Sequence, residues 1–401
     1  MSPSLRSGFV LPSSGQGELK AVLAKLRLLA LRRLFAVPLG SLPASLRGPA
    51  KRLIDALPLW LRVAPAGLVA LEQPEVLTPL LAWESGALAA PVALSLAVPH
   101  LLGGLAAARA VADGLSWDAP FESLVERGAL FRFEPAAAGL SVNPAGVEVR
   151  LADGRLFQPG QVGSELPSAQ PYLFEVTPSL PELRLCTFDL NPLAHVEAHP
   201  DKHGNAVNLG GRSVAEWCGA LAAALELVQV ALPELHREMT RSLRRIVPVG
   251  YEPEQSLSAS YREAPGVVYL TLHPNPVTLA EALIHESQHG KLNALSFFDP
   301  VLENGHSEWA ASPVRPDLRP LMGVLLAAHA FVPVAEFHRR LAELGHELSV
   351  RESFTRRRGE VLESNRQALA ALAEKARPTA IGQQVLGDLS GLHATTLAAQ
   401  P

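Results

Sequence analysis

The chain has 401 residues, of which 48% are hydrophobic and 18% are charged, and its formal net charge is −4. This composition excludes a chain that is disordered throughout and provides no basic surface for nucleic acid. The length allows roughly two or three domains. The two cysteines, Cys186 and Cys218, are too few for a disulfide framework. The amino-terminal residues lack the order of a signal peptide, so a cytoplasmic protein is expected.

The first part of the sequence is predicted to be helical. From Glu18 to Phe35, apolar residues recur at helical spacing between lysines and arginines, which indicates a basic amphipathic helix docked on the N-terminal core. Roughly the first 125 residues are expected to be almost wholly α, with further helices around Arg52–Leu61, Leu68–Trp83 and Pro91–Asp113. The stretch Gly86–Val111 is almost uncharged, but its prolines and glycines favour a buried helix over a membrane span.

Alternating apolar and polar residues follow, and these predict short strands at Ala129–Glu134, Gly146–Leu151 and Arg155–Gln158, with Asp153-Gly154 as a hairpin turn. The predicted Asp153-Gly154 turn has two residues. The stretch Pro159–Pro181 is rich in Pro, Gly and Ser and is interpreted as a connection. A small β element is therefore expected before the second half of the chain.

The whole chain is predicted to be mainly α (α+β) in two domains. Residues 1–180 form a helical N-terminal domain with a small β element, which is a candidate for peptide binding because of its size and basic helix. Residues 181–401 form a second domain that contains the candidate metal site and a small antiparallel β element.

A histidine-bearing loop opens the functional part of the second domain. His195, His199 and His203 are spaced four apart, but Pro200 and Gly204 break any helix there. We interpret this segment as a loop that caps a pocket or contacts substrate, with His199 as the candidate residue, in preference to a second metal site.

Helices are predicted at Ser213–Ala231, with Trp217 on its apolar side, and at Leu235–Arg245. Two strands are predicted within Ser256–Leu272, and Val267–Leu272 is the strongest β run in the chain. This strand carries Tyr269, a candidate substrate-binding residue, and leads directly into the next predicted helix.

That helix is predicted from Thr278 to Leu295 and contains an H-E-x-x-H motif, His285-Glu286-Ser287-Gln288-His289. Thr278-Leu-Ala-Glu281 is predicted to be a capping box at its start. Residues four apart lie on the same face of a helix, so both imidazoles can bind one metal ion. The glutamate between them then lies beside that ion. Two interior histidines would otherwise need separate partners, so a metal site is favoured over two core histidines.

A mononuclear site needs a third protein ligand. His329 is one candidate, because it lies in an apolar part of the predicted helix Leu318–Arg340 where an unpaired ring is costly; a satisfied core histidine is the alternative. Glu308 is the other candidate, because the number of residues between it and His289 in the sequence resembles the spacing in gluzincin metallopeptidases. Prolines and an Asn-Gly pair around Glu308 nevertheless leave no room for a long second helix. Two further helices are predicted, at Arg356–Ala376 and Thr379–Leu392.

Arg315 and Arg319 lie between the motif helix and the His329 helix. A guanidinium group binds a carboxylate through two hydrogen bonds, so either arginine can hold the acid group of a small cosubstrate. The alternative is that they pair with Asp317 or a nearby glutamate.

Taken in chain order, these residues resemble the HEXXH-motif peptide-modification proteins, which are encoded with ribosomally made and post-translationally modified peptides. The resemblance extends roughly from Leu183 to the C-terminus and rests on a Val-Tyr-Leu strand, Leu283-Ile-His-Glu-Ser-Gln-His-Gly-Lys-Leu, Ser312-Pro-Val-Arg-Pro-Asp-Leu-Arg-Pro-Leu, Gly323 and Ala330-Phe331. Relatives carry His-Gly where this chain has Leu326-Ala327, and His329 follows one turn later.

The resemblance implies a mononuclear iron(II), 2-oxoglutarate-dependent hydroxylase that acts on side chains of a precursor peptide. By the same resemblance, His285 and His289 are metal ligands and Arg315 or Arg319 binds 2-oxoglutarate. Glu286 is then a third ligand or an orienting residue.

Two other functions stay open. In a zinc metallopeptidase, Glu286 acts as the general base on a metal-bound water, and the strand Val267–Leu272 pairs with an extended substrate. In a catalytically inert partner protein, the chain only binds its peptide. No nucleic acid or membrane partner is expected for any of the three.

Overall fold

The computed structural model describes residues 9–12, 18–63, 65–107, 115–143, 146–159, 171–194, 206–312 and 317–399. It is 55% helical and 17% strand, which confirms the mainly α class with a smaller β component. Two compact units are present: unit 1 comprises Met1–Leu23, Glu175–Leu183 and Asn208–Pro401, and unit 2 comprises Ala24–Phe174 and Arg184–Val207. The predicted division at residue 180 thus falls inside a short stretch of unit 1, and the amino-terminal residues belong to the unit of the motif helix.

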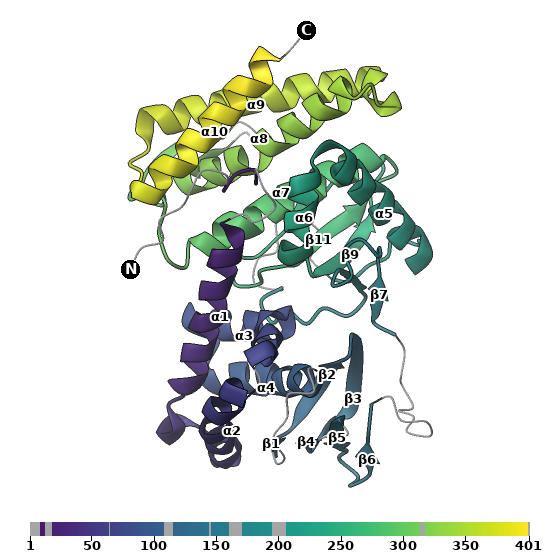
Figure 1. The fold of residues 1–401 in the computed structure, drawn as a ribbon, viewed down its shortest axis with the longest axis vertical. Helices are drawn as coiled ribbons and strands as arrows, with labels where there is room; N and C mark the ends of the chain where they lie inside the picture. Colours follow the sequence, from purple (N-terminus) through teal and green to yellow (C-terminus); the bar gives the residue numbers. More distant parts are fainter. Residues whose placement is uncertain are drawn as a thin grey trace. The chain divides into compact units, whose positions relative to one another are not determined.

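Unit 2 contains α1 (Leu19–Phe35, which starts in unit 1), η1 (Leu39–Ser41), α2 (Ala44–Val63), η2 (Pro65–Glu72), α3 (Pro74–Glu84) and α4 (Ala90–Ala107). Helix α4 packs against α3 and η2 and also against the strand β2 (Phe121–Glu126) (Figure 1). Gly103 permits this approach, because a methyl group there would overlap the backbone carbonyl of Val125. The apolar helix is therefore in the core of unit 2.

The other strands are β1 (Leu115–Trp117), β3 (Ala129–Ala137), β4 (Gly139–Asn143), β5 (Gly146–Arg150), β6 (Leu156–Phe157), β7 (Leu173–Glu175) and β8 (Arg184–Cys186). The strands β1, β4, β5 and β6 form an antiparallel sheet, and β2 pairs with β3. The predicted hairpin is present, but its loop has three residues, Ala152–Gly154, and not two, since Leu151 N–H donates to the Arg155 carbonyl at 2.8 Å and Gly154 has φ +85°. Strands begin at Leu115, so the prediction of an almost wholly α stretch up to residue 125 is wrong.

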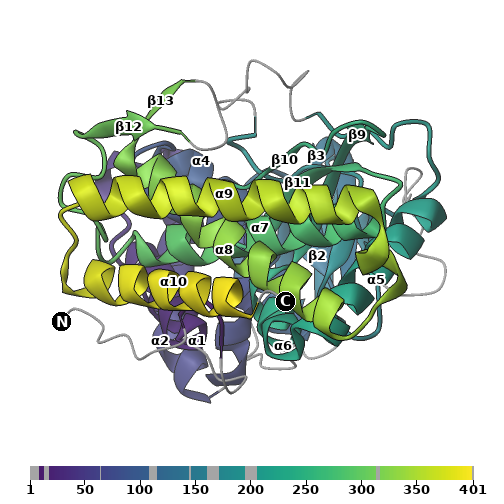
Figure 2. The same ribbon diagram turned by 90° about the horizontal axis from the view of Figure 1, so that it is seen from above.

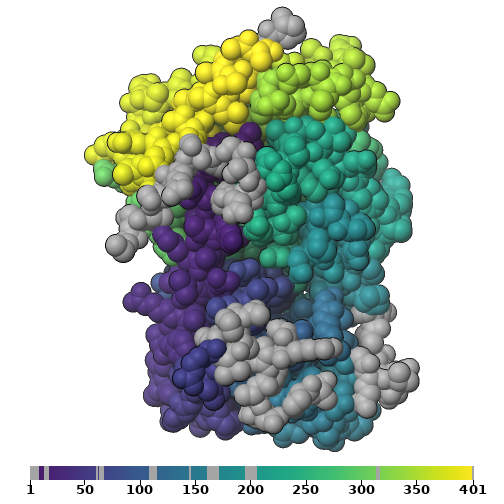
Figure 3. Space-filling model, viewed as in Figure 1, coloured from purple at the N-terminus to yellow at the C-terminus, as the bar shows by residue number. Residues whose placement is uncertain are grey.

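Unit 1 contains α5 (Val214–Ala231), α6 (Pro233–Ser242), β9 (Arg245–Tyr251), β10 (Ser258–Ala259), β11 (Val267–Leu272), α7 (Pro276–Leu295), β12 (Trp309–Ala311), β13 (Leu318–Pro320), α8 (Leu321–Glu343), η3 (Glu347–Val350), α9 (Glu352–Lys375) and α10 (Ala380–Ala398). Helix α8 is central, because it packs against α5, α7, α9 and α10. Figure 2 shows α9 and α10 side by side on the outside of this unit, and Figure 3 shows their side chains as part of its surface.

The helix α5 has the predicted start. Ser213 Oγ accepts from the Glu216 backbone N–H, and the Glu216 side chain accepts from Ser213 in return, which is a capping box. Trp217 is fully buried, as predicted, and its indole donates to the Leu209 carbonyl at 3.0 Å. Helix α6 ends at Ser242, before the predicted end, because β9 begins three residues later and pairs with β11.

The strand β11 is an interior strand. All six of its residues are buried, and it lies between β9, which is parallel to it, and β10, which is antiparallel. Tyr269 pairs with Ala259 on one side and Val247 on the other, and its fully buried ring lies 5.3 Å from that of Tyr261. An extended substrate therefore cannot pair with β11 at Tyr269, contrary to that prediction.

The motif helix α7 starts earlier than predicted. Asn275 is its N-cap, with Oδ1 accepting from Val277 N–H at 3.0 Å, and Pro276 occupies the first turn. The predicted capping box is wrong, because the Glu281 carboxylate is hydrogen-bonded at 2.8 Å to both His338 of α8 and Arg357 of α9. These long-range partners fix α7 against the two helices that cover it.

The segment after α7 has no long second helix, as its prolines predict. Trp309–Ala311 pairs instead with Leu318–Pro320 as the antiparallel strands β12 and β13. Because Leu318–Pro320 forms a strand that pairs with β12, α8 begins at Leu321 and not at the predicted Leu318.

Three helices of the described residues, α4, α5 and α8, are long and apolar enough to cross a membrane by length and composition. Of their most apolar windows, 67%, 39% and 78% are buried within the protein.

Candidate metal site

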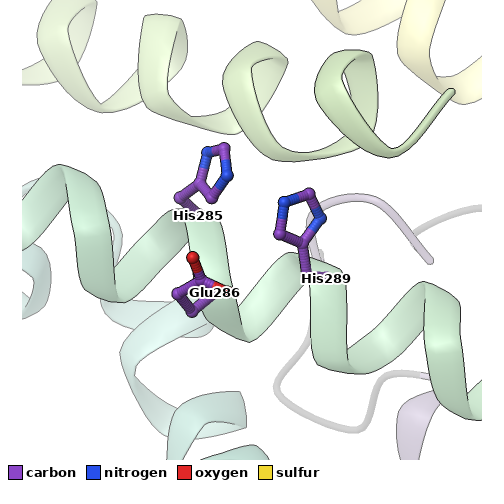
Figure 4. Close-up of side chains that lie close together, drawn as sticks. All are labelled: His285, Glu286 and His289. Atoms are coloured by element: carbon purple, nitrogen blue, oxygen red, sulfur yellow. The ribbon is translucent and has the colours of Figure 1, made fainter. Parts of the chain in front are cut away.

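Helix α7 brings His285, Glu286 and His289 together. One ligand atom from each residue lies within 4.8 Å of the other two. Among the residues that the structure describes, these three side chains are the group that could hold a metal ion. The two imidazole rings have centroids 4.3 Å apart at an interplanar angle of 82°. Figure 4 shows both rings projecting from the same side of α7 toward the neighbouring helix.

Two buried polar atoms of this group have no hydrogen-bond partner. They are Oε2 of Glu286, a residue only 2% exposed, and Nδ1 of His289. Burial lowers the pKa of His289, and the Glu286 charge only partly opposes this effect. The neutral imidazole is the form that binds a metal, and an ion would satisfy both orphan atoms.

The donor set of two nitrogens and one carboxylate oxygen suits Fe(II) or Zn(II). Ligands on opposite sides of one ion at bonds of about 2.1 Å are about 4.2 Å apart at most. The three ligand atoms lie within 4.8 Å of one another, so their side chains would draw closer together around an ion. The residues fit a mononuclear metal ion.

His329 lies beside this group without being part of it. Its side chain in α8 is fully buried, and neither ring nitrogen makes a hydrogen bond of normal geometry. Burial lowers its pKa well below the usual value, and the charges of Lys291 and His289 lower it further, although the Gln288 backbone carbonyl acts in the opposite direction. His329 is therefore a neutral, unsatisfied imidazole next to His289.

Glu308 is placed away from the motif. Its side chain is exposed, whereas its backbone carbonyl accepts from Leu321 N–H at 2.9 Å where β12 approaches α8. It does not join the three metal-ligating residues of α7. The structure thus gives no support to Glu308 as a third ligand.

Arg319 pairs with Asp317 at 3.1 Å, which is the alternative that the sequence left open. Arg315 and His199 lie outside the described residues. Tyr269 is fully buried in β11, so it offers no surface to a substrate.

Phe331 and Arg357 approach the motif, and their functional meaning was not evident from sequence. The Phe331 ring in α8 lies edge-on to His285 with centroids 4.7 Å apart, and the Arg357 guanidinium lies 5.8 Å from the Phe331 ring centre. Arg357 also donates to Glu281 at 2.8 Å, one turn before His285. Phe331 belongs to the quoted resemblance, but no periodicity or motif marks Arg357.

A buried polar cluster supports the far end of α7. Lys291 is fully buried and its Nζ lies 2.6 Å from Oε1 of Glu238 in α6. Lys291 also donates to the Val10 carbonyl at 3.2 Å, and the side-chain amide of Gln288 donates to the same oxygen at 3.1 Å. The amino-terminal stretch is therefore bound directly to the motif helix.

Neither a protein-family model nor a curated protein matches the chain. The fold and site define a mainly α protein with a two-histidine, one-carboxylate candidate metal site. Its function is therefore inferred from the chemistry of these residues.

Proposed function

We propose that the protein is an Fe(II)- and 2-oxoglutarate-dependent enzyme that hydroxylates a side chain of a ribosomally made precursor peptide. The observation that carries this proposal is the grouping of His285, His289 and Glu286 within 4.8 Å. Two histidines and one carboxylate with open positions are the ligand set of non-haem Fe(II) oxygenases. Bound iron would supply the activation of oxygen.

The buried carboxylate of Glu286 supports its role as a ligand. Its Oε2 lacks a hydrogen-bond partner although the residue is almost completely buried, and a cation offsets the cost of burying such a charge. His329 is the alternative third ligand, because it is neutral, buried and adjacent to His289. If His329 is the third ligand, Glu286 orients the metal ligands without binding the metal itself.

Phe331 of α8 and Arg357 of α9 lie near His285 and shape the site there. The ring contact with Phe331 restricts the orientation of His285, and the Arg357 guanidinium lies over the same aromatic ring, 5.8 Å from its centre. Arg315 or Arg319 keeps the proposed role of 2-oxoglutarate ligand on the strength of the resemblance, and Arg319 would exchange its partner Asp317 for the cosubstrate. Arg357 is a further cation close to the motif, although it is already paired with Glu281.

The zinc metallopeptidase is the competing function. It needs a third ligand besides the two histidines, because its glutamate acts as a base. Exposed Glu308 does not join the group, and β11 has neighbours on both sides at Tyr269. These observations favour the oxygenase, whereas His329 as a third ligand would also serve a hydrolase.

The proposal is tested with protein purified and loaded with Fe(II) in the absence of oxygen. Adding 2-oxoglutarate is expected to produce a charge-transfer absorption band, and admitting oxygen is expected to consume 2-oxoglutarate. Glu286→Gln is expected to weaken both if Glu286 is a ligand, and His329→Gln is expected to do so if His329 is. His306→Ala removes an exposed histidine and is the matched control.

Peptide cleavage that requires only Zn(II), with no effect of 2-oxoglutarate, would contradict the oxygenase. Glu286→Gln would then abolish cleavage and leave zinc bound. Protein that binds no metal but still binds its peptide would instead support the inert partner.

A further inference from the structure

The amino-terminal stretch Phe9–Pro12 is buried against the motif helix within unit 1. Phe9 and Val10 are each 1% exposed, as low as core residues. The Phe9 ring lies 5.6 Å from the ring of His329, and Lys291 Nζ lies 5.4 Å from the Phe9 ring centre. In Figure 1 this stretch is the short dark purple segment next to α8.

The stretch is held through its main chain. The Val10 carbonyl accepts from Gln288 Nε2 and Lys291 Nζ, whose side chains are both fully buried. Two side-chain donors that converge on one backbone carbonyl recognise any residue at that position, so they suit a peptide ligand as well as a segment of the same chain.

The same residues place the stretch beside the candidate metal ligands. Gln288 immediately precedes His289, and Lys291 follows it by two residues on α7. His329, against which Phe9 packs, belongs to α8, and this helix packs directly on α7. Phe9 and Val10 therefore occupy the space at the His289 end of the site.

We propose that the space filled by Phe9–Pro12 is the peptide-binding groove of this site, and that the amino-terminal stretch occupies it as an internal competitor of the substrate. The substrate segment has an aromatic residue packed on His329, followed by an aliphatic residue whose carbonyl binds Gln288 and Lys291. This inference rests on the proposed function in taking a peptide as the substrate, but the binding itself needs no metal.

A substrate groove and an ordinary core segment predict different effects of removing the Phe9 ring on the stability of unit 1. If Phe9–Pro12 is only part of the core, removing the Phe9 ring must lower the stability of the whole of unit 1. If it is an exchangeable occupant, the same change releases the stretch and lowers the stability only by the small free energy with which the stretch competes for the groove. It also exposes the groove to a peptide added from outside.

The test uses the full chain without metal and a fluorescent peptide, Arg-Ser-Gly-Phe-Val-Leu-Pro-Ser, with the sequence of residues 6–13. Phe9→Ala is expected to bind this peptide at least about tenfold more tightly than the wild-type chain, because the competent state is no longer occupied. Because a tenfold gain corresponds to about 1.4 kcal/mol of lost docking free energy, its Tm is expected to fall by only about 3–6 °C. A peptide with Asp in place of Phe should not bind.

Phe9→Asp, which expels the stretch more strongly, is the second variant. Val350→Asp places the same charge at a residue 81% exposed and should bind the peptide as weakly as wild type. If Phe9→Ala shows a large fall in Tm, or if the folded variants bind the peptide no better than wild type, the proposal is overturned.

Because these titrations are done without metal, they separate the groove from the catalytic proposal. Peptide binding by a chain that never binds metal would contradict the proposed function alone. Metal binding with no gain in peptide affinity in Phe9→Ala would contradict the groove alone.

Discussion

Replacing Lys291 with methionine is expected to destabilise the protein strongly, because Glu238 then remains buried without its counter-charge. The side chains of Lys291 and Glu238 are 0% and 3% exposed, Nζ of Lys291 lies 2.6 Å from Oε1 of Glu238, and Oε2 of Glu238 has no hydrogen-bond partner. Removing one member of a buried pair costs about 3–5 kcal/mol. For a unit of this size, that corresponds to a fall in Tm of roughly 6–20 °C.

The double variant Lys291→Met/Glu238→Leu isolates the pair. Lys291→Met also removes the hydrogen bond to Val10, but this loss occurs in both the single and the double variant and cancels in the cycle. An apolar pair of similar volume is often as stable as the ion pair, so the double variant should recover most of the lost stability.

Urea and thermal unfolding of the wild type, both single variants and the double variant give the coupling energy, which should exceed about 2 kcal/mol. The exposed pair Arg366 and Glu363 provides a control cycle in which little change is expected. If the two single losses of the buried pair simply add in the double variant, the two charges do not stabilise each other and the reasoning is refuted.

Two further predictions concern the helices around the site. Gly382→Ala should destabilise the protein by about 1–3 kcal/mol in urea unfolding, because the added methyl group overlaps the Val301 carbonyl where α10 docks. Gly387→Ala in the same helix has open space and should stabilise by about 0.5–1 kcal/mol; equal effects of the two would contradict this account. Burial lowers the pKa of His236 and His393, so the unfolded chain binds protons first and stability should fall as pH decreases below about 6.5. Unfolding at pH 7.5 and 5.5 measures this fall, which should be smaller in a variant with glutamine at both positions.

Local patterns in the sequence predicted the elements that carry the motif. The β-rich run Val267–Leu272, the helical segment Ser213–Ala231 and the four-residue spacing of His285 and His289 are all local signals, and the structure has a strand, a helix and a pair of neighbouring histidines there. The start of α7 was predicted wrongly, because Glu281 is bound by side chains of α8 and α9 that are far away in sequence.

The surroundings of the site could not be predicted, because they depend on how helices cross. The spacing of His329 gives no information on its distance from His289, which is set by the packing of α7 on α8. The approach of Phe9 to His329 has no local signal either, since 319 residues separate them along the chain. The start of α8 at Leu321 likewise depends on the pairing of β12 with β13.

Metal binding by the purified protein tests the central claim most directly. Titration with Fe(II) and with Zn(II), followed by metal analysis of the desalted protein, should give about one ion per chain for the wild type and for His306→Ala. His285→Ala and His289→Ala should each lose the metal while unfolding cooperatively near the wild-type Tm. Full metal occupancy in both of these variants would show that the H-E-x-x-H group does not hold a metal ion.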